Sequence, residues 1–221
     1  MALDASATPV PLAAKPRLRG MLHLIAFPVS LFAGTMLVTA WARGLRATIG
    51  SAVYAVTGAV LFGVSALYHR GQWDERTHAL LRRLDHSNIF LLIAGTYTPI
   101  VLMLLDGASQ VALLVAVWVG ALAGILFRLV WLDAPRWLYT PFYVGLGWVA
   151  IAALPELARN GGGTTVALLV IGGLAYSLGG LVYGLRWPDP VPTVFGYHEV
   201  FHSCTLAGFA AHFVAVVLVV R

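Results

Sequence analysis

The residues from Tyr197 to His212 place two candidate metal ligands in an otherwise apolar stretch. The string YHEVFHSCTLAGFAAH puts His198 and His202 four residues apart, on one face of a helix. With Glu199 it also matches H-E-x-x-H, in which zinc proteases use the histidines as ligands and the glutamate as general base. Glu199 would lie about 100° around the helix from His198, so the pattern leaves its role open. The histidine pair is the stronger part of the motif.

A third histidine and two other polar residues occur at the ends of different apolar runs. His69 ends the run SALYH, one helical turn after Ser65, and Asp85 lies in RRLDHSN, where a later run begins. Three histidines suit zinc, since catalytic zinc sites keep three protein ligands and an exchangeable water. Three neutral ligands leave the charge of the ion in place, which is costly to bury. Asp85 could offset that charge, orient a histidine or hold the water.

These residues also have ordinary structural explanations. Asp85 could form a loop salt bridge with Arg82 or Arg83, and Ser65 could simply pack between helices. His212, in the middle of an apolar run, is expected to hydrogen-bond within the protein. Three further histidines near the ends of runs are expected to be solvated: His23, His78 and His86.

The composition indicates whether these residues belong to a water-soluble protein or to a membrane protein. Hydrophobic residues make up 60% of the 221 and charged residues 10%, with a mean hydropathy of +0.85. A water-soluble protein would expose too much apolar surface at this composition, so we expect an all-α integral membrane protein. The net charge of +5 fits basic loops beside anionic headgroups, and no aromatic-interleaved basic patch indicates nucleic-acid binding. A single cysteine, Cys204, excludes an internal disulfide.

Seven apolar runs are long enough to cross a bilayer as helices, because a core of about 30 Å needs roughly 20 helical residues. They cover residues 22–42, 47–68, 87–105, 109–131, 137–155, 164–185 and 197–220. Residues 1–20 lack the order of features of a signal peptide, and we expect a short disordered cytoplasmic tail there. Residues 21–221 are then a single seven-helix transmembrane domain.

The basic residues orient this bundle. Of the 14 Lys and Arg, ten lie on the side of the N-terminus and four on the other side. The positive-inside rule therefore places the N-terminus in the cytoplasm and the C-terminus outside, in a multi-pass protein of the inner (plasma) membrane. In this orientation the second, third and seventh spans bring His69, Asp85, His198 and His202 to one depth near the cytoplasmic face, with Ser65 one turn away.

The strings SALYH, LRRLDHSNIFLLIAGTYTPI and HEVFHSCTLAGFAAHF together resemble the hemolysin III proteins, bacterial members of the progestin and adiponectin receptor (PAQR) family. The resemblance extends over essentially the whole chain after the tail, and its motif positions are Ser65, His69, Asp85, His198 and His202. It implies a seven-helix bundle in which the three histidines hold zinc near the cytoplasmic face, beside the Asp and the Ser. The family is similar in plan to the alkaline ceramidases, which hydrolyse a lipid amide. It requires no acid at the position of Glu199, which argues against a zinc protease.

Three functions remain open from the sequence. In the first, the protein is a zinc-dependent hydrolase of ceramide-like or other acyl lipids, with Asp85 and Ser65 as catalytic residues and membrane lipids as substrates or ligands. In the second, zinc is structural in a non-enzymatic membrane sensor or membrane-homeostasis protein. The third is a pore-forming hemolysin, which the lack of a ring of charges does not favour. The sequence does not indicate whether the chain forms a homodimer.

Overall fold

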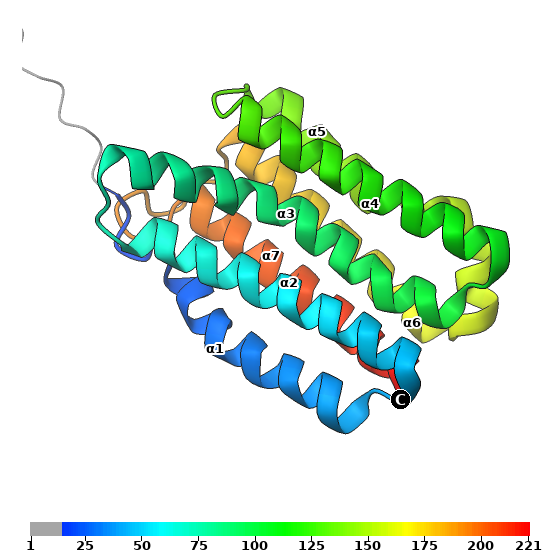
Figure 1. Ribbon diagram of the computed structural model, residues 1–221. Helices are drawn as coiled ribbons and strands as arrows, with labels where there is room; N and C mark the ends of the chain where they lie inside the picture. The colour runs from blue at the N-terminus through cyan, green and yellow to red at the C-terminus, as the bar shows by residue number, and fades with distance from the viewer. Residues whose placement is uncertain (1–14) are drawn as a thin grey trace, which may run out of the picture.

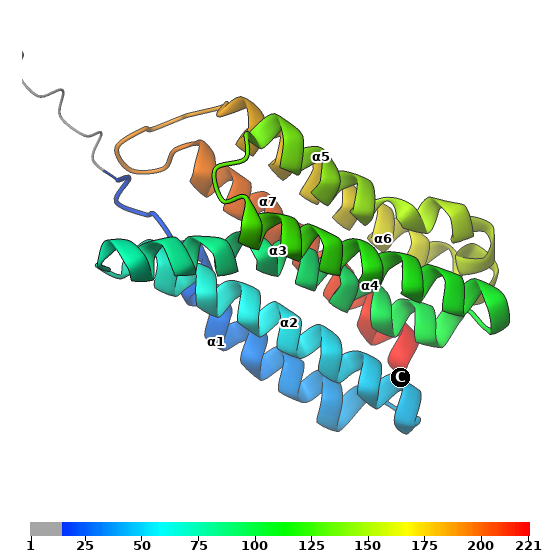
Figure 2. The same ribbon diagram turned by 45° about the horizontal axis from the view of Figure 1, so that its top comes forward.

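The computed structural model describes residues 15–221, and helices make up most of this part of the chain (Figure 1). In chain order they are α1 (Met21–Met36), continued by a π-helical turn (η1, Leu37–Trp41), α2 (Gly44–Arg70), α3 (Glu75–Leu104), α4 (Gly107–Val130), α5 (Arg136–Gly147), a 3₁₀ turn (η2, Val149–Ala153), α6 (Leu154–Leu185) and α7 (Tyr197–Val220). Figures 1 and 2 show these helices packed along one another as one bundle, with α3 between α2 and α4. The prediction of an all-helical fold is confirmed for the described residues.

The outer surface of the bundle is apolar, as expected for a protein surrounded by lipid. Within residues 15–221, six stretches are long and apolar enough to cross a membrane: Met21–Trp41, Gly44–Arg70, Glu75–Leu104, Gly107–Val130, Arg136–Leu185 and Tyr197–Val220. Large apolar side chains on them are exposed, including Phe32 at 68% and Leu126 at 62%. Water-soluble monomers rarely expose continuous apolar surface on this scale. The chain is therefore a multi-pass membrane protein.

The structure corrects the predicted boundary between residues 137–155 and 164–185. Helix α6 begins at Leu154 and runs through the expected loop, so that Arg136–Leu185 forms one candidate span of 50 residues. The backbone leaves helical geometry at Gly162, where φ is 74°. Glycine tolerates this left-handed conformation because it has no Cβ. The glycine-rich segment therefore makes a kink where the sequence suggested a loop.

Beyond this kink α6 runs back along α5 (Figures 1 and 2). Gly180 of α6 lies against Thr140 in α5, whereas Gly173 lies against Trp148, which follows α5. Later residues of one segment thus face earlier residues of the other, so the pairing is antiparallel. Helix α6 therefore ends at the end of the bundle where α5 begins.

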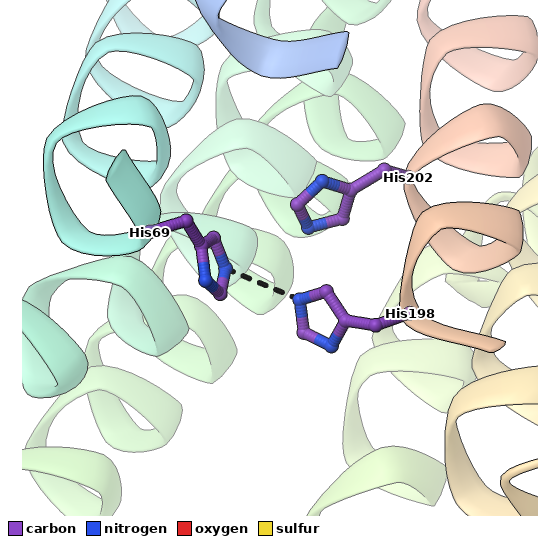
Figure 3. Close-up of side chains that lie close together, drawn as sticks. All are labelled: His69, His198 and His202. Atoms are coloured by element: carbon purple, nitrogen blue, oxygen red, sulfur yellow. Dashed lines mark hydrogen bonds between the residues drawn. The ribbon is translucent and has the colours of Figure 1, made fainter. Parts of the chain in front are cut away.

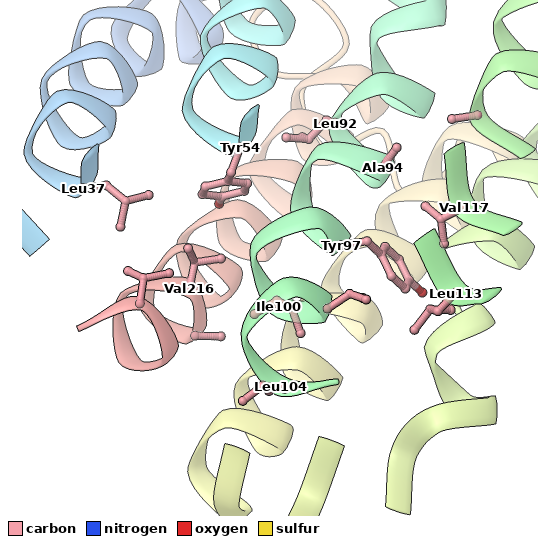
Figure 4. Packing of buried hydrophobic residues seen from close by; sticks show 14 of the residues in the cluster. Leu37, Tyr54, Leu92, Ala94, Tyr97, Ile100, Leu104, Leu113, Val117 and Val216 are labelled. Atoms are coloured by element: carbon pink, nitrogen blue, oxygen red, sulfur yellow. The ribbon is translucent and has the colours of Figure 1, made fainter. Parts of the chain in front are cut away.

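Buried side chains from α2, α3, α4 and α7 form most of the main core (Figure 4). They include Tyr54, Ile100, Val117 and Val216. Because lipid tails are as apolar as these side chains, close packing and buried hydrogen bonds hold the helices together. Tyr97 of α3 shows both effects: it is buried in this core, and its hydroxyl donates to the Gly147 carbonyl at 2.7 Å and accepts from the Ala150 N–H at 2.9 Å. This pair of bonds fixes α3 against the segment between α5 and α6.

The expected disordered tail, residues 1–20, lies mainly outside the described residues. Its described part, residues 15–20, is joined to the loop before α7 by two backbone hydrogen bonds, in which the N–H groups of Arg17 and Leu18 donate to carbonyls at 3.0 and 3.1 Å. Residues 15–20 are therefore held against the end of the bundle where α7 starts.

Candidate metal centre

Three histidines meet at this end of the bundle (Figure 3). His69 lies in the last turn of α2, and His198 and His202 lie one turn apart at the start of α7. One ring nitrogen of each lies within 4.8 Å of the other two, and the Nε2 atoms of His69 and His198 are 3.1 Å apart. The His69 side chain is 7% exposed, and the other two residues are buried. The structure thus brings together the three histidines that the sequence predicts as metal ligands.

The first turn of α7 is fixed by Glu199, the glutamate of the H-E-x-x-H string. Its Oε2 accepts the N–H of Gly196, the N-cap residue, at 2.9 Å. Its Oε1 accepts Nε of Arg19 at 2.5 Å, and the side chain is 1% exposed. Both oxygens are occupied by these contacts, and the carboxylate is not part of the histidine cluster. Glu199 therefore joins the N-terminal segment to α7, and the zinc-protease reading of the string does not fit.

Asp85 and Ser65 lie beside the histidines. Oδ2 of Asp85, on α3, is 3.9 Å from Nε2 of His69. Ser65 is 2% exposed, one turn before His69 on α2, and lines the same cavity as Asp85. The alternative of a loop salt bridge is not adopted, because neither Arg82 nor Arg83 pairs with Asp85 within 4.0 Å; Arg82 pairs with Asp133 at 3.0 Å. Helices α2, α3 and α7 therefore bring five polar side chains to one place.

The donor set fits a divalent metal ion such as zinc. Imidazole nitrogen is one of the ligand types that zinc prefers, and three protein ligands are usual where a position stays open. Two nitrogens bound 2.0–2.1 Å from one tetrahedral ion lie about 3.4 Å apart. The separation of 3.1 Å between His69 and His198 is close to this value. The three histidines could therefore hold a metal ion, with Asp85 near enough to balance part of its charge.

A fourth histidine, His23, lies against the cluster, and the expectation that it is solvated is wrong. It is 3% exposed, and its ring stacks on that of His202 with centroids 3.7 Å and planes 5° apart. Neither ring nitrogen has a hydrogen-bond partner among the described residues. The sequence contained a usable indication, because His23 follows Arg19 by one turn and so begins the first span at the depth where His69 ends the second.

The remaining histidines have separate roles. His86 is only 9% exposed, contrary to expectation, because α3 turns it inward; its Nδ1 lies 2.6 Å from Nη2 of the buried Arg128. His78 is half-buried. His212 forms the expected internal hydrogen bond, between its Nε2 and the Leu169 carbonyl at 3.0 Å.

Two cavities adjoin the histidine cluster. The inner one, about 120 Å³, lies between the helices and is lined mainly by apolar and aromatic side chains, with Ser65, Asp85 and His202 among the polar ones. The outer one, about 570 Å³, lies where α2 and α6 end and α5 and α7 begin. Four residues line both cavities: His86, Tyr139, Tyr183 and His198. The cluster is therefore next to both the apolar interior and the polar end of the bundle.

Comparison with known proteins gives consistent matches along the chain. A family model described as Haemolysin-III related matches residues 12–213. The hemolysin-3 homolog of Bacillus subtilis (strain 168) is 37% identical over 164 residues, which cover 74% of this chain and 74% of that protein. Hemolysin-3 of Bacillus cereus is 34% identical over 174 residues, 79% of this chain and 76% of that protein.

Proposed function

Because the chain belongs to the hemolysin III family, we propose that it is a zinc-dependent hydrolase of membrane lipids. The observation that carries this proposal is the position of the histidine cluster between the two cavities, with Asp85 and Ser65 beside it. A lipid acyl chain could occupy the inner cavity while its amide or ester bond reaches the cluster. Among the described residues this is the one group of three possible metal ligands, and it lies beside a carboxylate and an apolar cavity.

Each residue of the site has a role in this proposal. His69, His198 and His202 would hold the zinc ion, and the chemistry that it would supply there is that of a Lewis acid. Asp85 would accept a proton from the attacking water and return it to the leaving group. Ser65 donates a hydrogen bond that orients the water or stabilises the oxyanion. The apolar helices keep bulk water away from the acyl chain.

The same proposal includes seven membrane crossings, with the N-terminus inside and the C-terminus outside. The antiparallel pairing of α5 with α6 supports two crossings by Arg136–Leu185. The excess of basic residues at the end of the bundle that carries the histidines supports a cytoplasmic site, and the inner membrane as the location. Membrane lipids are then the substrates.

Hydrolysis can be tested with the purified full-length protein, loaded with zinc, on a panel of ceramides, acyl amides and acyl esters in mixed micelles. Release of fatty acid is expected from at least one class. Asp85→Asn should reduce this release by about a hundredfold or more while zinc stays bound. The matched control is Asp106→Asn, since Asp106 is 84% exposed and pairs with Arg46 away from the site. Zinc-loaded protein that hydrolyses nothing in the panel would refute the proposal.

A structural metal in a non-enzymatic sensor or homeostasis protein is the second candidate. It is favoured by the contact between His69 of α2 and His198 of α7, two residues that are 129 positions apart in the chain. Metal binding would then contribute directly to the stability of the bundle. In that case Asp85→Asn should leave the cellular effect of the protein unchanged. A pore-forming hemolysin, the third hypothesis, draws only on the names of the two Bacillus relatives.

A further inference from the structure

The outer cavity is strongly basic. No Asp or Glu of the described chain lines it. Five of the residues that line it are Lys or Arg: Lys15, Arg19, Arg82, Arg136 and Arg186. We call this cavity the basic vestibule. Two of its cations are balanced, Arg19 by Glu199 and Arg82 by the exposed Asp133. Arg136 has no carboxylate within 4.0 Å among the described residues, so the vestibule keeps an excess of positive charge.

Arg136 is held in a fixed position beside this cavity. Its guanidinium donates to the Tyr183 carbonyl at 3.2 Å and stacks over the Tyr183 ring, 4.4 Å from the centroid. It also donates to the Tyr197 hydroxyl at 3.3 Å. These contacts are all to neutral groups, so they orient the guanidinium and leave its charge uncompensated. A guanidinium that is already ordered binds an anion at a smaller entropic cost.

A second uncompensated cation lies behind the wall that the two cavities share. Arg128 is completely buried, and its Nη2 lies 2.6 Å from Nδ1 of His86 while its guanidinium stacks 4.2 Å from the Tyr139 centroid. No carboxylate of the described chain lies within 4.0 Å of it. His86 and Tyr139 line both cavities and so lie at the junction between them. The charge of Arg128 therefore acts on this junction through a medium of low dielectric constant. The junction thus favours a negatively charged group.

We propose that the two cavities together bind one amphiphile, with its acyl chain in the inner cavity and an anionic head group, such as a phosphate, in the basic vestibule. This inference rests on the proposed function, because the bond to be cleaved would then lie at the histidine cluster between the two parts. The inference narrows the proposed substrates to one class, which is acyl lipids whose head group, on the far side of the amide or ester bond from the acyl chain, is negatively charged. A neutral head group gains no ion pair with Arg136.

The test uses the full-length protein in nanodiscs of phosphatidylcholine. Two fluorescent acyl amides of equal chain length serve as probes, one with a hydroxyl and one with a phosphate on an ethanolamine head. The phosphate probe should bind about tenfold or more tightly at low salt, and this preference should shrink at high salt. Arg136→Gln with Arg186→Gln should reduce the preference to about twofold or less. Arg159→Gln, which removes an exposed cation at the other end of α6, should leave it unchanged.

Binding is measured in zinc-loaded and in chelator-treated protein, so that the result does not depend on hydrolysis. Equal affinities for the two probes, or a preference that persists in the double variant, would overturn the inference. Inorganic phosphate should compete about a hundredfold more weakly than the phosphate probe, because it lacks the acyl chain. If inorganic phosphate competes as well as the phosphate probe, the vestibule is a site for free phosphate, and the inference is overturned. If the protein prefers the phosphate probe but hydrolyses no lipid, only the proposed function is contradicted. If it hydrolyses lipids but does not prefer the phosphate probe, only this inference is contradicted.

Discussion

The Nε2 atoms of His69 and His198 lie 3.1 Å apart, although 129 positions separate the two residues in the chain. The contact joins the last turn of α2 to the first turn of α7. Packing alone does not require the two imidazoles to approach so closely, because His69 also packs against Tyr68 and His198 against Tyr183. Their separation is close to that of two ligands on one tetrahedral ion, which connects the geometry of the helix ends to metal binding.

Removal of any one histidine of the cluster should therefore reduce metal binding. We expect the purified protein to carry about one zinc ion per chain, and His69→Ala, His198→Ala and His202→Ala each to lose most of it. Elemental analysis by plasma mass spectrometry measures the content without any assumption about activity. His78→Ala is the matched control, since His78 is half-buried on α3 and outside the cluster. Wild-type zinc content in all three cluster variants would show that the ion is held elsewhere.

Glu199→Gln should affect stability and leave metal binding intact. The substitution removes the charge that balances Arg19 while the side chain remains buried, and we expect a loss of about 2 kcal/mol in the free energy of unfolding. Thermal unfolding in detergent measures the loss, and zinc content is measured on the same samples. Glu75→Gln, at an exposed position in the first turn of α3, should change neither quantity. A stable Glu199→Gln protein without zinc would instead place this carboxylate in the metal site.

The sequence was sufficient to predict which ends of the helices meet. If the predicted spans cross in alternating directions, their order brings His69, Asp85 and His198 to one depth, and in the structure these residues lie close together. It was not sufficient to predict the burial of His23 and His86, although the position of His23 at the start of the first span indicated its depth. Whether a residue at the end of a span points inward depends on the rotation of its helix, and helices that are apolar on nearly all faces give little indication of this rotation.

Gly95→Ala should destabilise the bundle because α3 and α2 are in close contact there. A Cβ at position 95 would lie 2.1 Å from Oγ1 of Thr57, whose hydroxyl is itself buried and bonded to the Tyr54 carbonyl. We expect a loss of about 1–3 kcal/mol in unfolding free energy, measured by thermal or denaturant unfolding in micelles. At Gly184 of α6 nothing lies within 4 Å of a new Cβ, so Gly184→Ala should be neutral or stabilise by up to about 1 kcal/mol. Equal effects of the two substitutions would contradict the close packing of α2 and α3.

Asp74 gives a pH dependence at the start of α3, outside the apolar spans. Its carboxylate accepts the side-chain hydroxyl of Thr77 and the N–H groups of Thr77 and Arg76, and these bonds, the Thr77 hydroxyl first, lower the pKa of Asp74. Because the folded-state pKa is lowered, the stabilisation is complete above the unfolded value near 4 and is lost as the pH falls through the folded one. Hydrogen exchange of the first-turn amides should accelerate in Asp74→Ala at neutral pH. This difference from wild type should disappear in acid.

The control for this measurement is Asp106, the N-cap residue of α4. Its side chain makes no capping hydrogen bond, and its ion pair with Arg46 is exposed, so Asp106→Ala should change exchange in α4 only slightly. An Asp74 effect that stays constant from neutral pH to acid would mean that the charge of the carboxylate is not what stabilises the turn.

The ring of His23 should support metal binding by holding His202 in position. The two rings are parallel, 3.7 Å apart and buried, and His23 is not among the residues that could ligate the ion. Loss of such a stack costs about 0.5–1.5 kcal/mol, so His23→Ala should weaken zinc binding roughly two- to tenfold in a competition assay with a chelator. His23→Phe keeps an aromatic ring without nitrogens and should retain most of the affinity. If His23→Phe loses as much affinity as His23→Ala, the nitrogens of His23 matter, and this residue takes part in the site through hydrogen bonding.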